Sequence, residues 1–147
     1  MAITVNWFGL GLLDILESPR DLEAVTLKLA LATSSYTPNR DTDDFRNDFT
    51  ANELANGNGY TTGGVTLTTV ATSYDSASDE VRLDFDDPSW TFTGAKTWRY
   101  GIVYIDTAGA DSTDPLIALL TWDSNQTVST AYTLTIDSAG LLYLDVT

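Results

Sequence analysis

Apolar and polar residues alternate with a period of two along much of the chain. Apolar side chains occupy every second position in residues 25–31, 65–67 and 81–85. Such alternation predicts strands with one buried and one solvent-facing side. Trp90 and Phe92 follow Pro88 and predict a further short strand.

Two longer stretches, residues 98–105 and 116–122, are apolar at nearly every position. They predict central strands that are covered on both faces. Alternating apolar residues at 132–136 and 142–146 flank a polar turn at 137–140, which predicts a C-terminal hairpin. Six to eight strands at this spacing predict a mainly β protein, an antiparallel β-sandwich or jelly-roll-like domain.

The first twenty residues follow a different pattern. Between Trp7 and Leu16 the only charged residue is Asp14, and apolar residues recur at helical spacing. Pro19 ends the pattern, because the residue before a proline avoids helical backbone angles. We expect one domain, with a short apolar helix in residues 1–20 and a β-sandwich in residues 24–147. A helix that is apolar around most of its surface must be buried, in its own core or on another subunit.

One short helix is expected within the β-region. Thr42 is a suitable N-terminal cap, acidic residues 43–44 suit the first turn, and Phe45, Phe49 and Leu54 would face inward. Residues 56–64 hold four glycines. Their spacing does not match a phosphate-binding loop and no lysine follows, so they predict turns.

The chain has 147 residues, no cysteine and a net charge of −14. Seven scattered basic residues cannot form the concentrated positive face that nucleic acid or anionic membranes require. The acidity predicts a soluble, weakly self-repelling surface, with recruitment of a basic partner as the alternative. Residues 1–16 lack the positive start of a secretory signal.

Histidine is absent as well, which excludes catalytic triads and removes, with cysteine, both usual zinc ligands. Glu80, Asp84, Asp86 and Asp87 could in principle form a glycosidase pair, but a strand face and a turn explain them better. We therefore expect no catalytic residues, no cofactor and no enzyme activity.

Two weaker candidates for a binding site are present. Asp41, Asp43, Asp44 and Asp48 lie close in sequence, but they lack the calcium-loop pattern, and helix capping explains them better than a metal. Aromatic residues can stack on sugars, although most should form the core of a β-domain. These residues are Tyr36, Tyr60, Tyr74, Trp90, Trp98, Tyr104 and Trp122.

Several segments resemble small virion proteins of tailed bacteriophages. The likeness is carried by residues 27–38, 41–45, 70–85, 99–104 and 114–117, and by Gly-Tyr-Thr-Thr-Gly-Gly at 59–64. The apolar N-terminal segment fits as well. The shared pattern consists of packing and turn residues and contains no catalytic signature.

The resemblance implies a capsid decoration or cement protein on the particle surface. Its partners would be the major capsid protein or other virion proteins, and copies of itself, with trimers favoured by capsid symmetry. The alternative is a tail- or fibre-associated module that binds a glycan or receptor. The candidate docking residues lie in the N-terminal segment: Trp7, Phe8, Leu12, Leu13 and Leu16.

Overall fold

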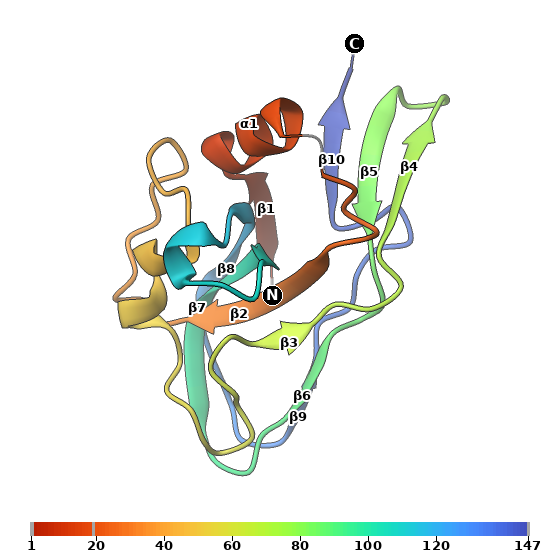
Figure 1. Cartoon of the computed structure of the whole chain (residues 1–147). Coiled ribbons are helices and arrows are strands. Elements are labelled where there is room, and N and C mark those ends of the chain that lie inside the picture. Colours follow the sequence, from red (N-terminus) through yellow and green to blue (C-terminus); the bar gives the residue numbers. More distant parts are fainter. Residues whose placement is uncertain (1, 19, 147) are drawn as a thin grey trace.

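The computed structural model describes residues 2–18 and 20–146 and is mainly β (Figure 1). It has one α-helix, α1, and three single-turn 3-10 helices, η1 to η3. In chain order the elements are β1 (Ile3–Trp7), α1 (Gly9–Glu17), β2 (Thr26–Ala32), η1 (Arg46–Asp48), η2 (Thr50–Asn52), β3 (Val65–Thr66), β4 (Ala71–Asp75), β5 (Glu80–Asp84), β6 (Ser89–Thr91), β7 (Lys96–Asp106), η3 (Asp111–Thr113), β8 (Leu116–Val128), β9 (Ala131–Thr133) and β10 (Leu142–Asp145).

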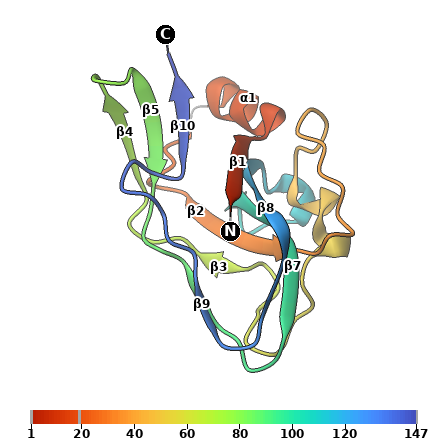
Figure 2. The same ribbon diagram turned by 180° about the vertical axis from the view of Figure 1, so that it is seen from behind.

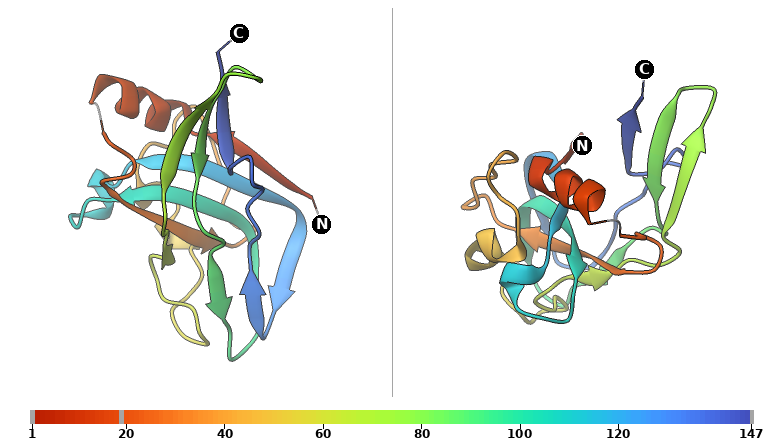
Figure 3. Two further views of the ribbon diagram at one scale, coloured as in Figure 1. Left: turned by 90° about the vertical axis from the view of Figure 1, so that its right-hand side faces the viewer. Right: turned by 45° about the horizontal axis from the view of Figure 1, so that its top comes forward.

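Three antiparallel sheets make up a β-sandwich-like fold. The central sheet has the strand order β1-β8-β7-β2-β3, and smaller sheets have the orders β10-β5-β4 and β6-β9. The β6–β9 ribbon crosses one side of the central sheet (Figure 2). The β10-β5-β4 sheet stands beside α1 (Figure 3).

The central part of this sheet, in β2, β7 and the first half of β8, is buried on both faces. One face packs against the smaller sheets through a large cluster that includes Leu29, Trp98 and Trp122. The other face carries a second cluster, which includes Phe8 and Phe49 from the segments that cover it. The predicted two-sided burial of residues 98–105 and 116–122, in β7 and β8, is therefore confirmed.

Most of the strands predicted from alternation are present. Residues 25–31, 65–67, 81–85 and the segment at Trp90 correspond to β2, β3, β5 and β6. The N-terminal helix is present, but it begins at Gly9 rather than at Trp7. Residues 3–7 form an edge strand instead, because Ile3, Val5 and Trp7 alternate with polar residues and pair with β8.

The predicted C-terminal hairpin is wrong. The turn at 137–140 exists, since the Gly140 N–H donates to the Asp137 carbonyl over 2.8 Å. It directs the chain to other partners, however: β9 pairs with β6, and β10 pairs with β5 through Leu142–Leu83 and Leu144–Val81. Burial of the apolar side of β10 against β5 outweighs the local pairing.

The predicted inserted helix is also different. Residues 46–52 form the two 3-10 turns η1 and η2, with Phe49 wholly buried. The side chain of Asp48, and not that of Thr42, accepts the free N–H groups of Asp44 and Phe45. These short turns let the segment lie flat on the central sheet.

Candidate docking cleft

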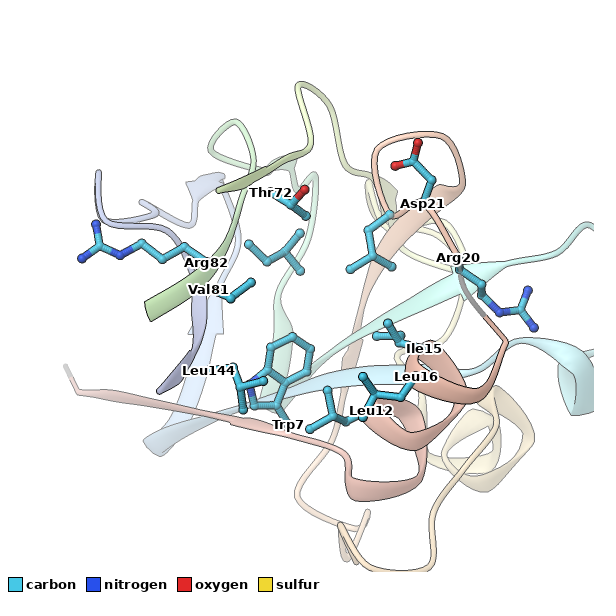
Figure 4. A pocket seen from close by; sticks show the side chains of 12 residues that line it. Trp7, Leu12, Ile15, Leu16, Arg20, Asp21, Thr72, Val81, Arg82 and Leu144 are labelled. Carbon is cyan, nitrogen blue, oxygen red and sulfur yellow. The ribbon is translucent and has the colours of Figure 1, made fainter. Parts of the chain in front are cut away.

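An apolar cleft opens between α1 and the β10-β5-β4 sheet (Figure 4). Its volume is about 360 Å³. Leu12 and Leu16 of α1 line one wall, and Val81 and Leu144 of the sheet line the other. Trp7 lies between the two walls at the end of β1. We call this hollow the α1 cleft.

The pairing of the strands creates the sheet wall. Val81 lies opposite both Tyr74 and Leu144, and Leu83 lies opposite Leu142, so all these side chains share one face. Toward the core this face is buried. Toward the free end of the sheet it is open, with Val81 40% and Tyr74 57% exposed.

Backbone contacts fix the helix wall. The N–H groups of Phe8 and Gly9 donate to the carbonyls of Ile117 and Arg40, which replaces a side-chain cap at the start of α1. Gly11 is buried against Leu116 of β8, at a distance that excludes any side chain. The close contact fixes the position of α1, whose Leu12, Ile15 and Leu16 form the cleft wall.

The indole of Trp7 joins the two sheets at the closed end of the cleft. Its Nε1–H donates to the main-chain carbonyl of Tyr143 in β10 over 3.0 Å. Trp7 also packs on the central core. The two walls are thus linked at the bottom and separate toward solvent.

Exposed apolar residues occur on the elements that form this cleft, and two of them, Leu16 and Val81, line it. Among the described residues, the large hydrophobic side chains that are exposed all come from α1, the β10-β5-β4 sheet and the residue after β10. They are Leu13, Leu16, Tyr74, Val81, Tyr143 and Val146. Exposed apolar side chains that line a cleft are typical of an interaction site.

Three ionisable side chains line the cleft, those of Arg20, Asp21 and Arg82. Arg20 is paired with Asp14 over 2.8 Å, and Arg82 is paired with Asp75 and Glu80 over 2.8 Å each. Both arginines point away from the hollow (Figure 4). A hydrogen bond from the N–H of Ala77, together with Arg82, lowers the pKa of Asp75, so this carboxylate stays charged.

The predicted docking residues divide into two groups. Leu12 and Leu16 line the α1 cleft with Trp7, and Leu13 lies on the same helix with 45% of its surface exposed. Phe8 is completely buried in the second core cluster and presents no surface to a partner. The docking role of the other four residues stays a prediction.

A second hollow lies between the edges of β1 and β10. It is lined by residues 3–7 and 141–143 and by Arg40, with a volume of about 580 Å³. It is more polar than the α1 cleft and holds fewer exposed apolar side chains. We therefore regard the α1 cleft as the better candidate.

The acidic residues considered for glycoside hydrolysis are engaged by their neighbours. Asp86 accepts the hydroxyls of Thr68 and Thr69, and Asp87 accepts the N–H of Ile136. Asp84 accepts the N–H of Phe85, and Glu80 binds Arg82. Each of these carboxylates thus stabilises the local turn or strand to which it belongs.

The aspartates considered for calcium have similar local roles. Asp43 accepts the hydroxyl of Tyr36 over 2.6 Å and the N–H of Asn39 over 2.9 Å. Burial and the neighbouring Asp48 raise the pKa of Asp44. No group of three or more potential metal ligands occurs within residues 2–18 and 20–146.

The predicted turn glycines and core aromatics are found in those roles. Gly57, Gly59, Gly63 and Gly64 all have positive φ angles. Of the aromatic residues considered for sugar stacking, only Tyr74 is exposed. The tryptophans form an internal cluster, in which Trp98 meets Trp122 edge-on.

Sequence patterns did not indicate one buried polar network. Glu53 accepts the hydroxyl of Tyr60 over 2.8 Å and the N–H of Gly63, and it forms an ion pair with Arg46 over 2.9 Å. Arg46 also bonds Asp111 and lies 5.5 Å from the ring centre of Tyr104. The network joins segments distant in sequence, so no local motif marks it.

The sequence did not predict the sheet wall of the cleft either, because this wall also depends on contacts between distant segments. Val81 and Leu144 have the alternation of ordinary strand residues, and the predicted C-terminal hairpin paired residues 142–146 with residues 132–136 instead of with β5. Alternation in residues 71–75 was weak, so β4 was not recognised. The signal available in the sequence for this wall was Tyr74, an aromatic residue shortly before the strand predicted at residues 81–85.

No family model, curated protein or solved structure matches this chain. No helix in the described part of the chain is long and apolar enough to cross a membrane.

Proposed function

We propose that this chain is a non-enzymatic structural protein of a bacteriophage virion, a capsid decoration or cement protein. In this proposal it binds the assembled shell through protein–protein contacts in the α1 cleft. The apolar lining of this cleft, with the exposed side chains of Leu16 and Val81 on its two walls, carries the binding part of the proposal. The virion part is supported by the resemblance of the sequence segments to phage proteins.

The chemistry of the surface agrees with binding rather than catalysis. The cleft walls are mostly apolar; Arg20 and Arg82 are held in ion pairs, and Asp21 accepts the N–H of Glu23. A pocket of this kind offers contact area but no nucleophile or proton relay. The alternative, a glycan-binding module of a tail or fibre, gains little support, because Tyr74 and Tyr143 are the only exposed aromatic side chains among the described residues.

Co-sedimentation with assembled phage particles that lack this protein tests the proposal. We expect the wild-type chain to pellet with the particles. Leu16→Ser combined with Val81→Ser should weaken the binding at least roughly tenfold, because apolar anchors dominate interface energies. Both side chains are exposed, so the fold should tolerate the change.

Tyr143→Ser is the matched control. Tyr143 is 60% exposed and lies on the same sheet, but it faces away from the α1 cleft, since its neighbour Leu144 lines it. This variant should bind particles as the wild type does. A wild-type chain that stays in the supernatant, or equal binding by the cleft variant, would contradict the proposal.

A further inference from the structure

We infer that Glu23 blocks the free edge of β4, and that removal of its side chain lets two copies of the chain pair edge to edge through this strand. β4 is the outer strand of the β10-β5-β4 sheet (Figure 1). We call the side of this strand that faces away from β5 the β4 edge. The backbone groups on the edge of a sheet are a template for pairing with another chain, and folded proteins commonly protect them.

The hydrogen-bond pattern of the sheet shows which backbone groups lie on the β4 edge. The N–H of Val146 donates to the carbonyl of Asp79, so the odd-numbered residues of β5 bond β10. The even-numbered residues of β5 therefore bond β4, and they lie opposite the odd-numbered residues of that strand. The N–H and C=O groups of Thr72 and Tyr74 consequently point away from β5.

Glu23 takes the place of a neighbouring strand's carbonyl at this edge. Its Oε1 accepts both the N–H and the hydroxyl of Thr72, each over 2.7 Å. A turn holds the residue there: the N–H of Glu23 donates to the side chain of Asp21 over 3.0 Å, and the Asp21 carbonyl accepts the next two N–H groups. The hydrogen bonds from the hydroxyl and the N–H of Thr72 lower the pKa of Glu23, so the carboxylate is charged at neutral pH.

The strand itself carries little protection. Edge strands are usually blunted by lysine, proline or a bulge, whereas residues 71–74 are Ala, Thr, Ser and Tyr. All four residues are exposed, and the threonine and tyrosine favour extended backbone. The protection at Thr72 comes instead from Glu23, which lies outside the sheet.

A second copy of the chain is the occupant that fits the β4 edge. Two β4 strands related by a twofold axis are antiparallel, and an axis at Ser73 places Thr72 of each copy opposite Tyr74 of the other. The outward N–H and C=O groups of these residues would then bond one another. Because residues 71–74 carry no charge, the pairing is opposed by the overall repulsion between two chains of −14 and by Glu23.

Light scattering over a concentration series tests the inference. Measurements at about 0.5 M salt screen the overall repulsion. Under these conditions we expect Glu23→Ala to associate with a dissociation constant of about 1 mM or less, and the wild type to keep a constant mass. Glu23→Gln is the matched control: it loses the same charge but keeps an oxygen that accepts from Thr72, so it should behave as the wild type does.

Two further measurements place the contact on β4. Thr72→Pro in the Glu23→Ala background removes the N–H at an edge position, where a strand tolerates proline, and should restore the wild-type mass. Amide hydrogen exchange at low protein concentration reports the block directly. Exchange at Thr72 should be at least roughly tenfold faster in Glu23→Ala than in the wild type, because the bond to a charged acceptor is lost.

Several outcomes would overturn the inference. Association of Glu23→Gln as strong as that of Glu23→Ala would show that charge, and not the hydrogen bond, protects the edge. A folded Glu23→Ala protein with constant mass, association that persists with Thr72→Pro, or equal exchange at Thr72 would contradict it as well. Docking in the α1 cleft is tested separately, since its exposed anchors Leu16 and Val81 are unchanged in these variants.

Discussion

Glu53 shows how a single residue can hold a segment on the central sheet. The segment is formed by residues 33–64, which connect β2 to β3, and we call it the covering segment. Only 2% of its side chain is exposed, and its two oxygens bind Arg46, Tyr60 and Gly63. Burial opposes the charge on Arg46, but Tyr104, Glu53 and Asp111 outweigh this effect and raise its pKa. Arg46 therefore keeps its positive charge, and the carboxylates of Glu53 and Asp111 compensate that charge in the fold.

Glu53→Ala should destabilise the protein by about 3 to 5 kcal/mol, because it leaves a largely buried guanidinium without its main partner. Urea unfolding followed by tryptophan fluorescence measures the loss. Arg82→Ala is the contrasting control, since its ion pairs are more exposed to solvent and should contribute much less to stability. Equal losses in the two variants would show that burial of the Glu53 network adds nothing.

At the scale of elements, the packing of α1 on β8 decides whether the cleft exists. A methyl group on Gly11 would lie 1.6 Å from the carbonyl oxygen of Leu116. The glycine lets the helix backbone touch the strand, so that Leu12 and Leu16 face the β10-β5-β4 sheet. The position of one wall therefore depends on the absence of a side chain.

Gly11→Ala should cost about 1 to 3 kcal/mol, because the added methyl forces the helix away from the strand. It should also weaken particle binding, since the cleft wall moves. Gly9→Ala is the control: its methyl would meet only the Arg40 carbonyl, at 3.3 Å. Thermal unfolding followed by circular dichroism compares the variants, and a Gly11→Ala protein as stable as the wild type would show that the contact is not restrictive.

Element positions were predictable from the sequence where burial imposes a clear pattern. The two-sided apolar runs of β7 and β8 and the alternation in β2 and β5 identify the core strands without further information. The residues of α1 were predictable from their helical spacing. Phe49 was correctly expected to face inward, although its segment forms 3-10 turns.

Partners of the strands were not predictable, because pairing depends on contacts between distant segments. The turn at 137–140 favours a local hairpin, yet Leu142 and Leu144 pair with β5, some sixty residues earlier. Both walls of the α1 cleft follow from this long-range pairing and from Gly11. Only the helix wall of the candidate site could therefore be predicted, through Leu12 and Leu16.

At the scale of the whole molecule, a layer of tyrosines connects the covering segment to the central sheet. Tyr36, Tyr60 and Tyr104 are each at most 3% exposed. Burial raises the pKa of all three phenols above the ordinary value of 10, and the nearby carboxylates Asp43 and Glu53 add to the effect. The folded chain, already at −14, therefore keeps these groups neutral at a pH at which the unfolded chain would ionise them.

The sign of the resulting pH dependence follows from the raised pKa values. The stabilisation is complete below about pH 10 and is lost as the pH rises above it, because only the unfolded state releases these protons. Each tyrosine should lower the free energy of unfolding by about 1.4 kcal/mol per pH unit, or about 4 kcal/mol per unit for the three. We expect a cooperative alkaline transition in which tyrosinate absorbance rises together with the loss of the circular dichroism signal.

Tyr36→Phe separates this linkage from general charge repulsion. The variant loses its hydrogen bond to Asp43, at a cost of about 1 kcal/mol at neutral pH, but it also removes one titrating group. The slope of unfolding free energy against pH above 10 should then fall by about a third, whereas repulsion alone would leave the slope unchanged. Ionisation of all seven tyrosines near pH 10 in a chain that remains folded would show that the covering segment is open to solvent. It would also show that Glu53 and its partners do not hold it against the sheet.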